Sequence, residues 1–344
     1  MLYGWGSNSY GGIGLGDNYS NRLTPKKVGS FTDWNMVSLS YNYSLGIRNG
    51  ILYSTGRGNE GQLGLGNIKL VTTFTQVGSF TDWDYVYTGG PHSLGIRNGI
   101  LYAWGYNNAG QLGIGNTKNK NIPTQVGSFT DWDSVSGGGY YSLGIRNGEL
   151  YAWGDNYYGQ LGLGDRTDRT VPTQVGSFTD WDFVSAGPYQ SYAIRNGKLY
   201  AWGWNLEGQL GLDDTNERIL VPTQVGSFTD WDYVSGNFHS LGLRNGKLYA
   251  WGQNDYGQLG LGDTTDRTVP TQVGSFSDWD YVSAGNTHSL GLRNGKLYAW
   301  GRNNAGQLGL GDTTNRTVPT QVGSFSDWYY ISQNSVSSLA IRNG

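Results

Sequence analysis

The dominant feature of this chain is a repeat of 49 or 50 residues that runs through its whole length. The dipeptide Leu-Tyr recurs seven times, beginning at Leu2, Leu52, Leu101, Leu150, Leu199, Leu248 and Leu297. Self-similarity at a fixed period of roughly 20–50 residues is the signature of repeat architectures, in which each repeat is one supersecondary unit. We therefore expect seven copies of one structural unit.

Each unit contains four short segments typical of β-strands, separated by turn signals. In one unit we expect strands over Leu248–Trp251, near Thr271–Val273, over Tyr281–Ala284 and over Ser289–Arg293. The Asn294-Gly295 pair that follows is a strong two-residue hairpin signal. Four strands per unit of this length indicate propeller blades. The sequence thus predicts an all-β, seven-bladed β-propeller of four-stranded antiparallel blades.

The two ends of the sequence favour a closed ring. The chain stops at Arg342-Asn343-Gly344, partway through the hairpin turn. Met1, directly before Leu2, occupies the repeat position that Lys296 occupies directly before Leu297. We expect Leu2–Trp5 to complete the last blade, so that N- and C-terminal strands share it and no open edges remain. Residues 1–344 would then form a single propeller domain, with blades at about 35–79, 84–128, 133–177, 182–227, 232–275, 280–324, and 329–344 plus 1–29.

The motifs GQLGLG, AGNTHSLGL and LYAWG, in this order, resemble the regulator of chromosome condensation repeat family. The resemblance covers the whole chain and implies a seven-bladed propeller. Functions in that family range from nucleotide exchange on a small GTPase, with chromatin binding, to bacterial β-lactamase inhibition, so fold alone does not choose the function. The exchange factors carry a protruding insertion, for which repeats of constant length leave no room here.

Comparing the seven units with each other divides the turns into two groups. In an antiparallel blade, alternate connections lie at the same end of the sheet. One end carries nearly constant turns, with an Arg and an Asp in every unit: Arg48, Arg97, Arg146, Arg195, Arg244, Arg293 and Arg342, and Asp33, Asp82, Asp131, Asp180, Asp230, Asp278 and Asp327. We interpret these as repeated Arg–Asp contacts that hold the turns, although a charged docking ring is the alternative.

The other end carries turns that differ between units and are rich in aromatic residues and histidine. Relaxed surface turns also vary, but aromatic side chains supply rigid contact area at low entropic cost. We therefore predict that this end binds a protein partner. The candidate residues are Tyr41, Tyr43, His92, Tyr106, Tyr140, Tyr141, Tyr157, Tyr158, Tyr189, Trp204, Phe238, His239, Tyr256 and His288.

Catalytic chemistry is not indicated. His92, His239 and His288 share one repeat position and are each followed by Ser. Adjacent residues cannot form a catalytic triad, so the alternative to partner binding for these histidines is a structural role in the turn. The segment from Asp263 to Asp266 has two carboxylates, too few for a calcium loop. Gly-rich elements lack the helix and lysine of a phosphate loop. We expect no enzyme activity, no cofactor and no metal site.

Charge and composition limit the remaining function classes. The net charge is −3 with no basic excess, which argues against nucleic acid as a partner. No signal peptide or spanning segment is visible, so a soluble chain, cytoplasmic or virion-associated, without membrane insertion is expected. We predict a non-catalytic protein-binding module for a partner of unknown identity. A structural component of a phage or cell-surface assembly, and an exchange-factor-like regulator of a small GTPase, are the alternatives.

Overall fold

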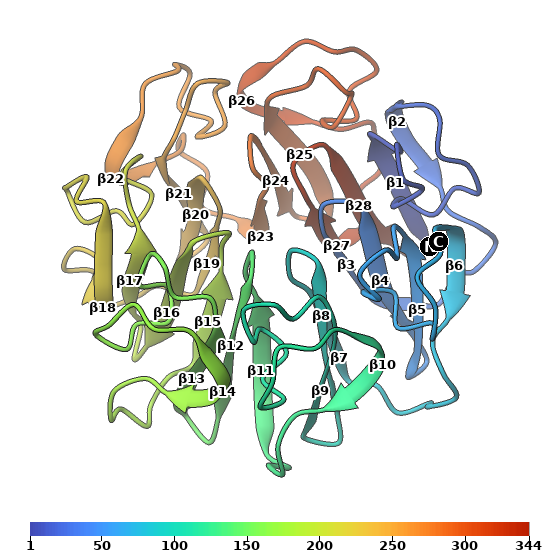
Figure 1. Cartoon of the computed structure of the whole chain (residues 1–344). Coiled ribbons are helices and arrows are strands. Elements are labelled where there is room, and N and C mark those ends of the chain that lie inside the picture. The colour runs from blue at the N-terminus through green and yellow to red at the C-terminus, as the bar shows by residue number, and fades with distance from the viewer. Residues whose placement is uncertain (344) are drawn as a thin grey trace.

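The computed structural model describes residues 1–343, and all regular secondary structure in them is β-strand. Seven four-stranded sheets stand in a ring around a central opening, and the two chain ends meet beside the same blade (Figure 1). The predicted seven-bladed, all-β propeller is thereby confirmed. Within the described part of the chain, no helix is long and apolar enough to cross a membrane.

Six blades follow one another along the chain. We number these blades one to six. Blade one comprises β3 (Trp34–Leu39), β4 (Tyr43–Arg48), β5 (Ile51–Gly56) and β6 (Val71–Gln76), and blade two comprises β7 (Tyr85–Thr88), β8 (His92–Arg97), β9 (Ile100–Gly105) and β10 (Lys120–Gln125). Blade three comprises β11 (Trp132–Gly137), β12 (Tyr141–Arg146), β13 (Glu149–Gly154) and β14 (Arg169–Gln174), and blade four comprises β15 (Phe183–Ala186), β16 (Gln190–Arg195), β17 (Lys198–Trp204) and β18 (Arg218–Gln224). Blade five comprises β19 (Tyr233–Gly236), β20 (His239–Arg244), β21 (Lys247–Gly252) and β22 (Arg267–Gln272), and blade six comprises β23 (Trp279–Ala284), β24 (His288–Arg293), β25 (Lys296–Gly301) and β26 (Arg316–Gln321).

The seventh blade joins the two ends of the chain, as expected. It is built from β27 (Trp328–Gln333), β28 (Ser337–Arg342), β1 (Leu2–Gly6) and β2 (Arg22–Lys27). Strands β28 and β1 pair antiparallel over five residues, from Leu2 opposite Ile341 to Gly6 opposite Ser337. The Met1 amino group also donates to the Arg342 carbonyl over 2.6 Å. The ring is therefore closed by ordinary sheet hydrogen bonds.

Within a blade, the first strand lies innermost and the fourth outermost. The second and third strands are joined by the predicted two-residue turns, in which both residues take positive φ, for example 47° at Asn294 and 71° at Gly295. The fourth strand differs from expectation, since β22 begins at Arg267 and ends one residue before Val273. It accommodates Pro270 because an outermost strand needs no ladder N–H on its free side.

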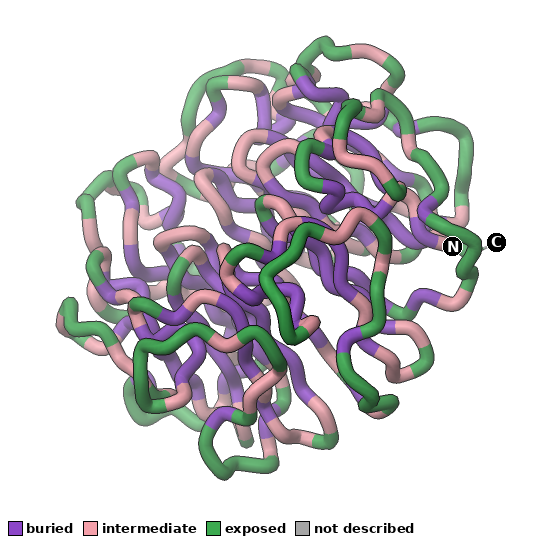
Figure 2. Tube along the Cα trace, turned by 45° about the vertical axis from the view of Figure 1, so that its right-hand side comes forward, coloured by how far each residue is buried: buried purple, intermediate pink, exposed green. Residues whose placement is uncertain are grey.

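The core consists of seven similar clusters packed between neighbouring blades, and Figure 2 shows the buried residues concentrated along the inner strands. A hydrogen-bonded joint accompanies each apolar contact. Between blades two and three, the Gln111 carbonyl accepts the Trp153 indole N–H over 2.9 Å and the Ser142 hydroxyl over 2.9 Å. Trp153 is fully buried, and the bond to Gln111 satisfies its indole N–H across the joint between the two blades.

The seven innermost strands enclose a channel of about 410 Å³. Tyrosine rings from several blades line it, and the hydroxyl of Tyr233 donates to that of Tyr281 over 3.0 Å. Burial raises the pKa of both phenols, so they stay protonated at neutral pH. Among residues 1–343, those that line the channel are all uncharged.

Candidate functional site: the variable loop face

Two kinds of connection share one end of the propeller, which we call the variable face: the turn between the first and second strands of each blade, and the long loop between the third and fourth strands. The start of each long loop is tied to the neighbouring turn. The Arg57 N–H donates to Asn42 over 2.8 Å, and the Trp204 N–H donates to Tyr189 over 3.0 Å. These bonds hold side chains from the two kinds of connection close together.

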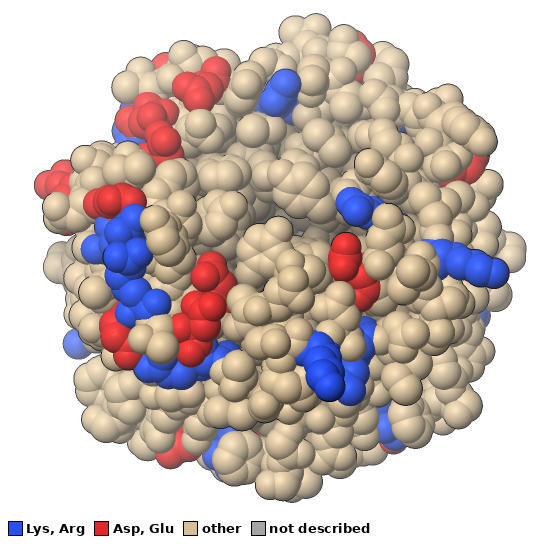
Figure 3. Space-filling model, in the orientation of Figure 1, with Lys and Arg blue, Asp and Glu red and all other residues tan. Residues whose placement is uncertain are grey.

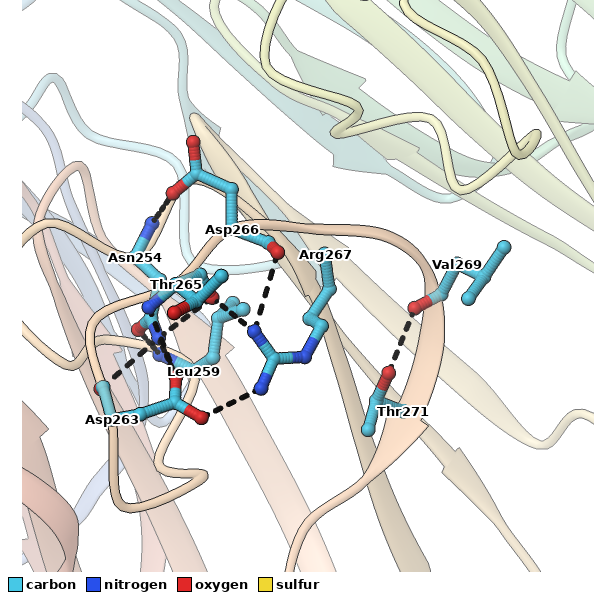
Figure 4. A network of polar contacts seen from close by, with 8 residues as sticks. All are labelled: Asn254, Leu259, Asp263, Thr265, Asp266, Arg267, Val269 and Thr271. Carbon is cyan, nitrogen blue, oxygen red and sulfur yellow. Dashed lines mark hydrogen bonds and ion pairs between the residues drawn. The ribbon is translucent and has the colours of Figure 1, made fainter.

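The long loops are organised by their own polar groups. In blade five, Asn254 donates to Asp263 and accepts from the Leu259 N–H, while the Asp263 carboxylate pairs with Arg267 over 2.6 Å (Figure 4). The Thr265 N–H and Arg267 lower the pKa of Asp263. The Asp266 carboxylate accepts the Asn254 N–H over 2.7 Å. The carboxylates of Asp263 and Asp266, considered above as calcium ligands, therefore accept hydrogen bonds that hold the loop.

Aromatic side chains on the variable face form a continuous row across three blades. The rings of Tyr157 and Tyr158 lie 4.9 Å apart, and Tyr158 is 5.2 Å from Tyr189. Trp204 lies 6.1 Å from Tyr189 and 5.8 Å from Phe238. Such centroid distances are those of favourable aromatic pairs. Loops from blades three, four and five thus contribute to one aromatic surface.

Nine of the fourteen candidate residues are at least partly exposed on this face. Tyr41, Tyr140 and Tyr157 are 57%, 42% and 53% exposed. The partly exposed candidates are Tyr106, Tyr158, Tyr189, Trp204, Phe238 and Tyr256. Most of these nine residues lie in the aromatic row or along the groove described below. The rings of Tyr106 and Tyr140 form a separate pair, with centroids 5.9 Å apart.

The other five candidates are corrected by the structure, because Tyr43, His92, Tyr141, His239 and His288 are at most 1% exposed. They share one repeat position, and their polar tips reach the following blade. The Tyr141 hydroxyl donates to the Gln190 carbonyl, and His92 Nε2 lies 3.0 Å from the Ser142 hydroxyl. A partner cannot contact them in this structure. Their regular place directly before Ser was the signal of an inter-blade joint.

A groove of about 610 Å³ crosses the variable face from blade four to blade one. Trp204, Phe238 and Tyr256 line one part of it, and Tyr10 and Tyr41 line another. Sequence comparison omitted Tyr10 from the candidates, although it occupies the same repeat position as Tyr256. Groove residues without aromatic rings, such as Asn42 and Val336, carried no comparable signal.

Charge is unevenly distributed over the variable face. Figure 3 shows acidic and basic side chains gathered towards β14, β18 and β22, whereas the surface around the central opening is largely uncharged. Part of this charge is paired, as between Arg169 and Asp165 over 2.6 Å and between Arg218 and Glu217 over 2.6 Å. The aromatic row therefore has a charged border on one side.

The opposite end, the constant face, carries the predicted Arg–Asp contacts. In each blade the recurring Arg pairs with an Asp, for example Arg97 with Asp82 over 2.7 Å. The same guanidinium stacks over Phe80 at 3.5 Å from the ring centroid. Hydrogen bonding from Arg97 lowers the pKa of Asp82. These charges are paired within blades, which agrees with the structural interpretation of the two rings.

The fold and this arrangement of loops define a closed seven-bladed propeller with one uniform and one varied face. The chain belongs to the family of RCC1-like domains. The RCC1-like domain model matches residues 1–235, and the regulator of chromosome condensation (RCC1) repeat model matches 245–292 and 294–336. The family resemblance of the repeat motifs is thereby confirmed.

Several known proteins are similar to this chain. Human WBSCR16 superposes with a TM-score of 0.88 at 20% identity, covering 100% of this chain and 98% of that one. Yeast RCC1 (Prp20), solved with Kap60 bound, gives a TM-score of 0.87 at 20% identity, covering 99% and 88%. A second structure, of Prp20p from Saccharomyces cerevisiae, was studied for its binding to Gsp1p and histones. At this identity the likeness shows the fold alone.

One curated relative matches over a short stretch. The ultraviolet-B receptor UVR8 of Arabidopsis thaliana is 38% identical over 71 residues, which is 20% of this chain and 16% of the receptor. The match thus covers much less than two thirds of the receptor, and it supports the repeat type only.

Proposed function

We propose that this chain is a non-catalytic protein-binding module whose partner docks on the variable face. The contact residues of this proposal are the candidates that reach the surface: Tyr41, Tyr106, Tyr140, Tyr157, Tyr158, Tyr189, Trp204, Phe238 and Tyr256.

The observation that supports the proposal best is the aromatic row from Tyr157 to Phe238. Tyrosine and tryptophan dominate the energetically important centres of protein interfaces, because they bury much area for few rotatable bonds. Here they come from different loops and pack against one another, so part of their entropy is already lost before binding. A preordered aromatic surface lowers the entropic cost of a specific protein contact.

Two further observations agree with a binding role. The scaffold repeats almost unchanged while the loops of one face differ, so a sevenfold framework presents an asymmetric surface. Prp20, a propeller of the same fold, has Kap60 bound in one structure and was studied for binding to Gsp1p and histones. Catalysis is not part of the proposal, because all three histidines are buried between blades.

The test is a capture experiment with matched variants. One variant replaces Tyr140, Tyr158, Trp204 and Tyr256 by Ala; its control replaces Val171, Val221, Val269 and Val318 by Ala, which are 40–50% exposed on outer strands. Proteins from the source organism are captured on immobilised wild type and both variants and identified by mass spectrometry. We expect one partner to be retained by wild type and control and lost by the aromatic variant.

Retention of that partner by the aromatic variant would refute the proposal. Both variants are first compared with wild type by thermal unfolding, so that loss of binding is not loss of folding. A stable oligomer in sedimentation, with no captured partner, would favour the assembly role instead. A captured small GTPase would favour the exchange-factor alternative, and nucleotide release from it would then be measured directly.

A further inference from the structure

One part of the groove combines aromatic rings with carboxylates. Trp204 and Phe238 meet edge to face, with centroids 5.8 Å apart and an interplanar angle of 84°. Glu207 and Asp255 line the groove beside them. Both carboxylates come from long loops, Glu207 from blade four and Asp255 from blade five. Two neighbouring loops therefore bring negative charge next to a tryptophan that is partly open to solvent.

These carboxylates lack cationic partners. Among residues 1–343, neither Glu207 nor Asp255 forms an ion pair, whereas Glu217 and Asp263 on the same loops are each paired with an arginine. Burial raises the pKa of Glu207, and the charges of Asp266 and Asp255 raise it further. The cluster is thus held together against its own repulsion, and a cation placed beside it would be stabilised.

Other loop tyrosines on this face already carry a cation. The Arg57 guanidinium lies 5.8 Å from the Tyr10 centroid, and Arg302 lies 4.7 Å from that of Tyr256. In the described part of the chain, no Lys or Arg takes such a place over Trp204 or Phe238, although tryptophan binds cations best of the aromatic residues. The strongest aromatic acceptor in the groove, with two carboxylates beside it, is therefore free to receive a charge from outside.

We propose that the groove seats one basic side chain of the protein partner, an arginine or a lysine, against the open side of Trp204 beside Phe238, with Glu207 and Asp255 as counter-charges. This inference rests on the proposed function, since the cation belongs to a docking protein. Arg302 lines the next part of the groove and repels a second positive charge. The partner segment is thus a single basic residue flanked by uncharged or acidic residues, rather than a polybasic stretch.

The experiment uses two short capped peptides, acetyl-Gly-Arg-Gly-amide and its citrulline counterpart, which has nearly the same shape without the charge. The full chain is labelled with 5-fluorotryptophan, and the resonance of residue 204 is assigned from the spectrum of Trp204→Phe. Titration is followed by fluorine NMR at low salt. We expect the residue 204 signal to shift saturably with the arginine peptide and to show at least about tenfold weaker binding of the citrulline peptide.

A matched pair of variants tests the counter-charges. Glu207→Gln combined with Asp255→Asn is expected to weaken arginine-peptide binding at least fivefold. Glu60→Gln is the control, because Glu60 has the repeat position of Glu207 in another blade but does not line the groove, and it is expected to leave binding unchanged. Equal affinity for the two peptides, or unchanged binding by the double variant, would overturn the inference.

The two proposals fail in different ways. If the aromatic variant loses its captured partner while the peptides show no charge preference, the docking face stands and the cation site falls. If the peptide binds at residue 204 while the aromatic variant keeps its partner, the proposed docking function falls instead.

Discussion

Lowering the pH from 7.5 to 5.0 is expected to destabilise the propeller through its three histidines. His92, His239 and His288 are fully buried at joints between blades, where each Nε2 lies 2.7–3.1 Å from a serine hydroxyl of the next blade. Burial lowers the pKa of each imidazole from 6.5 to about 3. All three are therefore neutral in the folded protein throughout this pH range.

The hydrogen bonds fix which nitrogen carries the proton. The Ser142 hydroxyl donates to the Gln111 carbonyl over 2.9 Å, so its oxygen accepts from His92 Nε2–H. His92 Nδ1 is then unprotonated, and it has no hydrogen-bond partner among the described residues. Protonation would create a buried charge without a counter-charge or acceptor. At His239 and His288 the partner serine likewise donates to a backbone carbonyl. Burial is the largest effect on the pKa of both histidines, although hydrogen bonding to the Asn286 backbone at His239 and to the Gln333 side chain at His288 acts in the opposite direction.

The magnitude follows from linkage between protonation and folding. A histidine with an ordinary pKa of 6.5 when unfolded and about 3 when folded binds its proton only in the unfolded state at pH 5. Each such group lowers the free energy of unfolding by about 2 kcal/mol at pH 5.0, relative to pH 7.5, and the three together by about 6 kcal/mol. The stability is thus present above pH 6.5 and is lost as the pH falls below it.

Carboxylates act differently from the histidines in this range. Hydrogen bonding from arginine lowers the pKa of Asp33, Asp82, Asp131, Asp180 and Asp278 below 3.8, so their contribution is lost only in stronger acid. Burial raises the pKa of Asp155 and Glu207, so these two carboxyl groups stabilise the fold as the pH falls, which is opposite in sign to the histidines. The histidine effect is therefore read as the difference between wild type and a variant that keeps all carboxylates but lacks the histidines.

The assay is urea unfolding at both pH values, followed by circular dichroism. The variant replaces all three histidines by Gln, the residue that blade four carries at this position as Gln190. Its own pH dependence between 7.5 and 5.0 is expected to fall below about 1 kcal/mol. Single variants, each expected to remove about a third of the effect, serve if the triple variant does not fold. A wild-type loss below about 1 kcal/mol, or an equal loss in the triple variant, would refute the reasoning.

Three further predictions concern stability and closure. Trp202→Ala is expected to lower the free energy of unfolding by about 3–5 kcal/mol, because Trp202 is fully buried and its indole N–H donates to the Gln160 carbonyl. Trp204→Ala is expected to lower it by less than about 1 kcal/mol, because Trp204 is partly exposed. Both values are read from urea unfolding midpoints. Gly148→Ala is expected to lower the free energy of unfolding by at least about 1 kcal/mol more than Gly176→Ala. Both glycines have positive φ, but a Cβ at residue 148 would lie 2.2 Å from the Thr179 carbonyl oxygen, whereas one at residue 176 would meet open space. Equal losses in the two variants would contradict a steric clash at residue 148. A circular permutant that joins Gly344 to Met1 and opens the chain between Gly148 and Glu149 is expected to fold with a melting temperature close to that of wild type, and failure to fold would count against ring closure through β1 and β28.

The fold could be predicted from the sequence because one unit, repeated seven times, contains every signal that its strands need. Asn-Gly pairs marked the hairpins, and the register of Met1 with Lys296 marked the closure that β1 and β28 make. The end of the fourth strand was less predictable, since β22 extends through Pro270 only because it lies outermost.

The sequence indicated which end of the propeller carries the candidate residues, but not which of these residues are exposed and which are buried. The repeat pattern places Tyr140 and Tyr141 on the same turn, yet Tyr140 is 42% exposed and Tyr141 is fully buried. Tyr141 is the first residue of β12 and stands directly before Ser142, whereas Tyr140 belongs to the preceding turn, so the start of the strand decides which of the two is buried. The groove and the pairing of Trp204 with Phe238 depend on loops of different blades, whose separation no single repeat encodes.

The most direct test of the central claim is hydrogen–deuterium exchange of the chain with and without its captured partner. We predict slower exchange in the complex at the long loops 155–168 and 205–217, and unchanged exchange at the constant-face turns 127–131 and 176–180. Protection confined to the constant-face turns, with the long loops exchanging as in the free protein, would contradict the claim that the varied aromatic face binds.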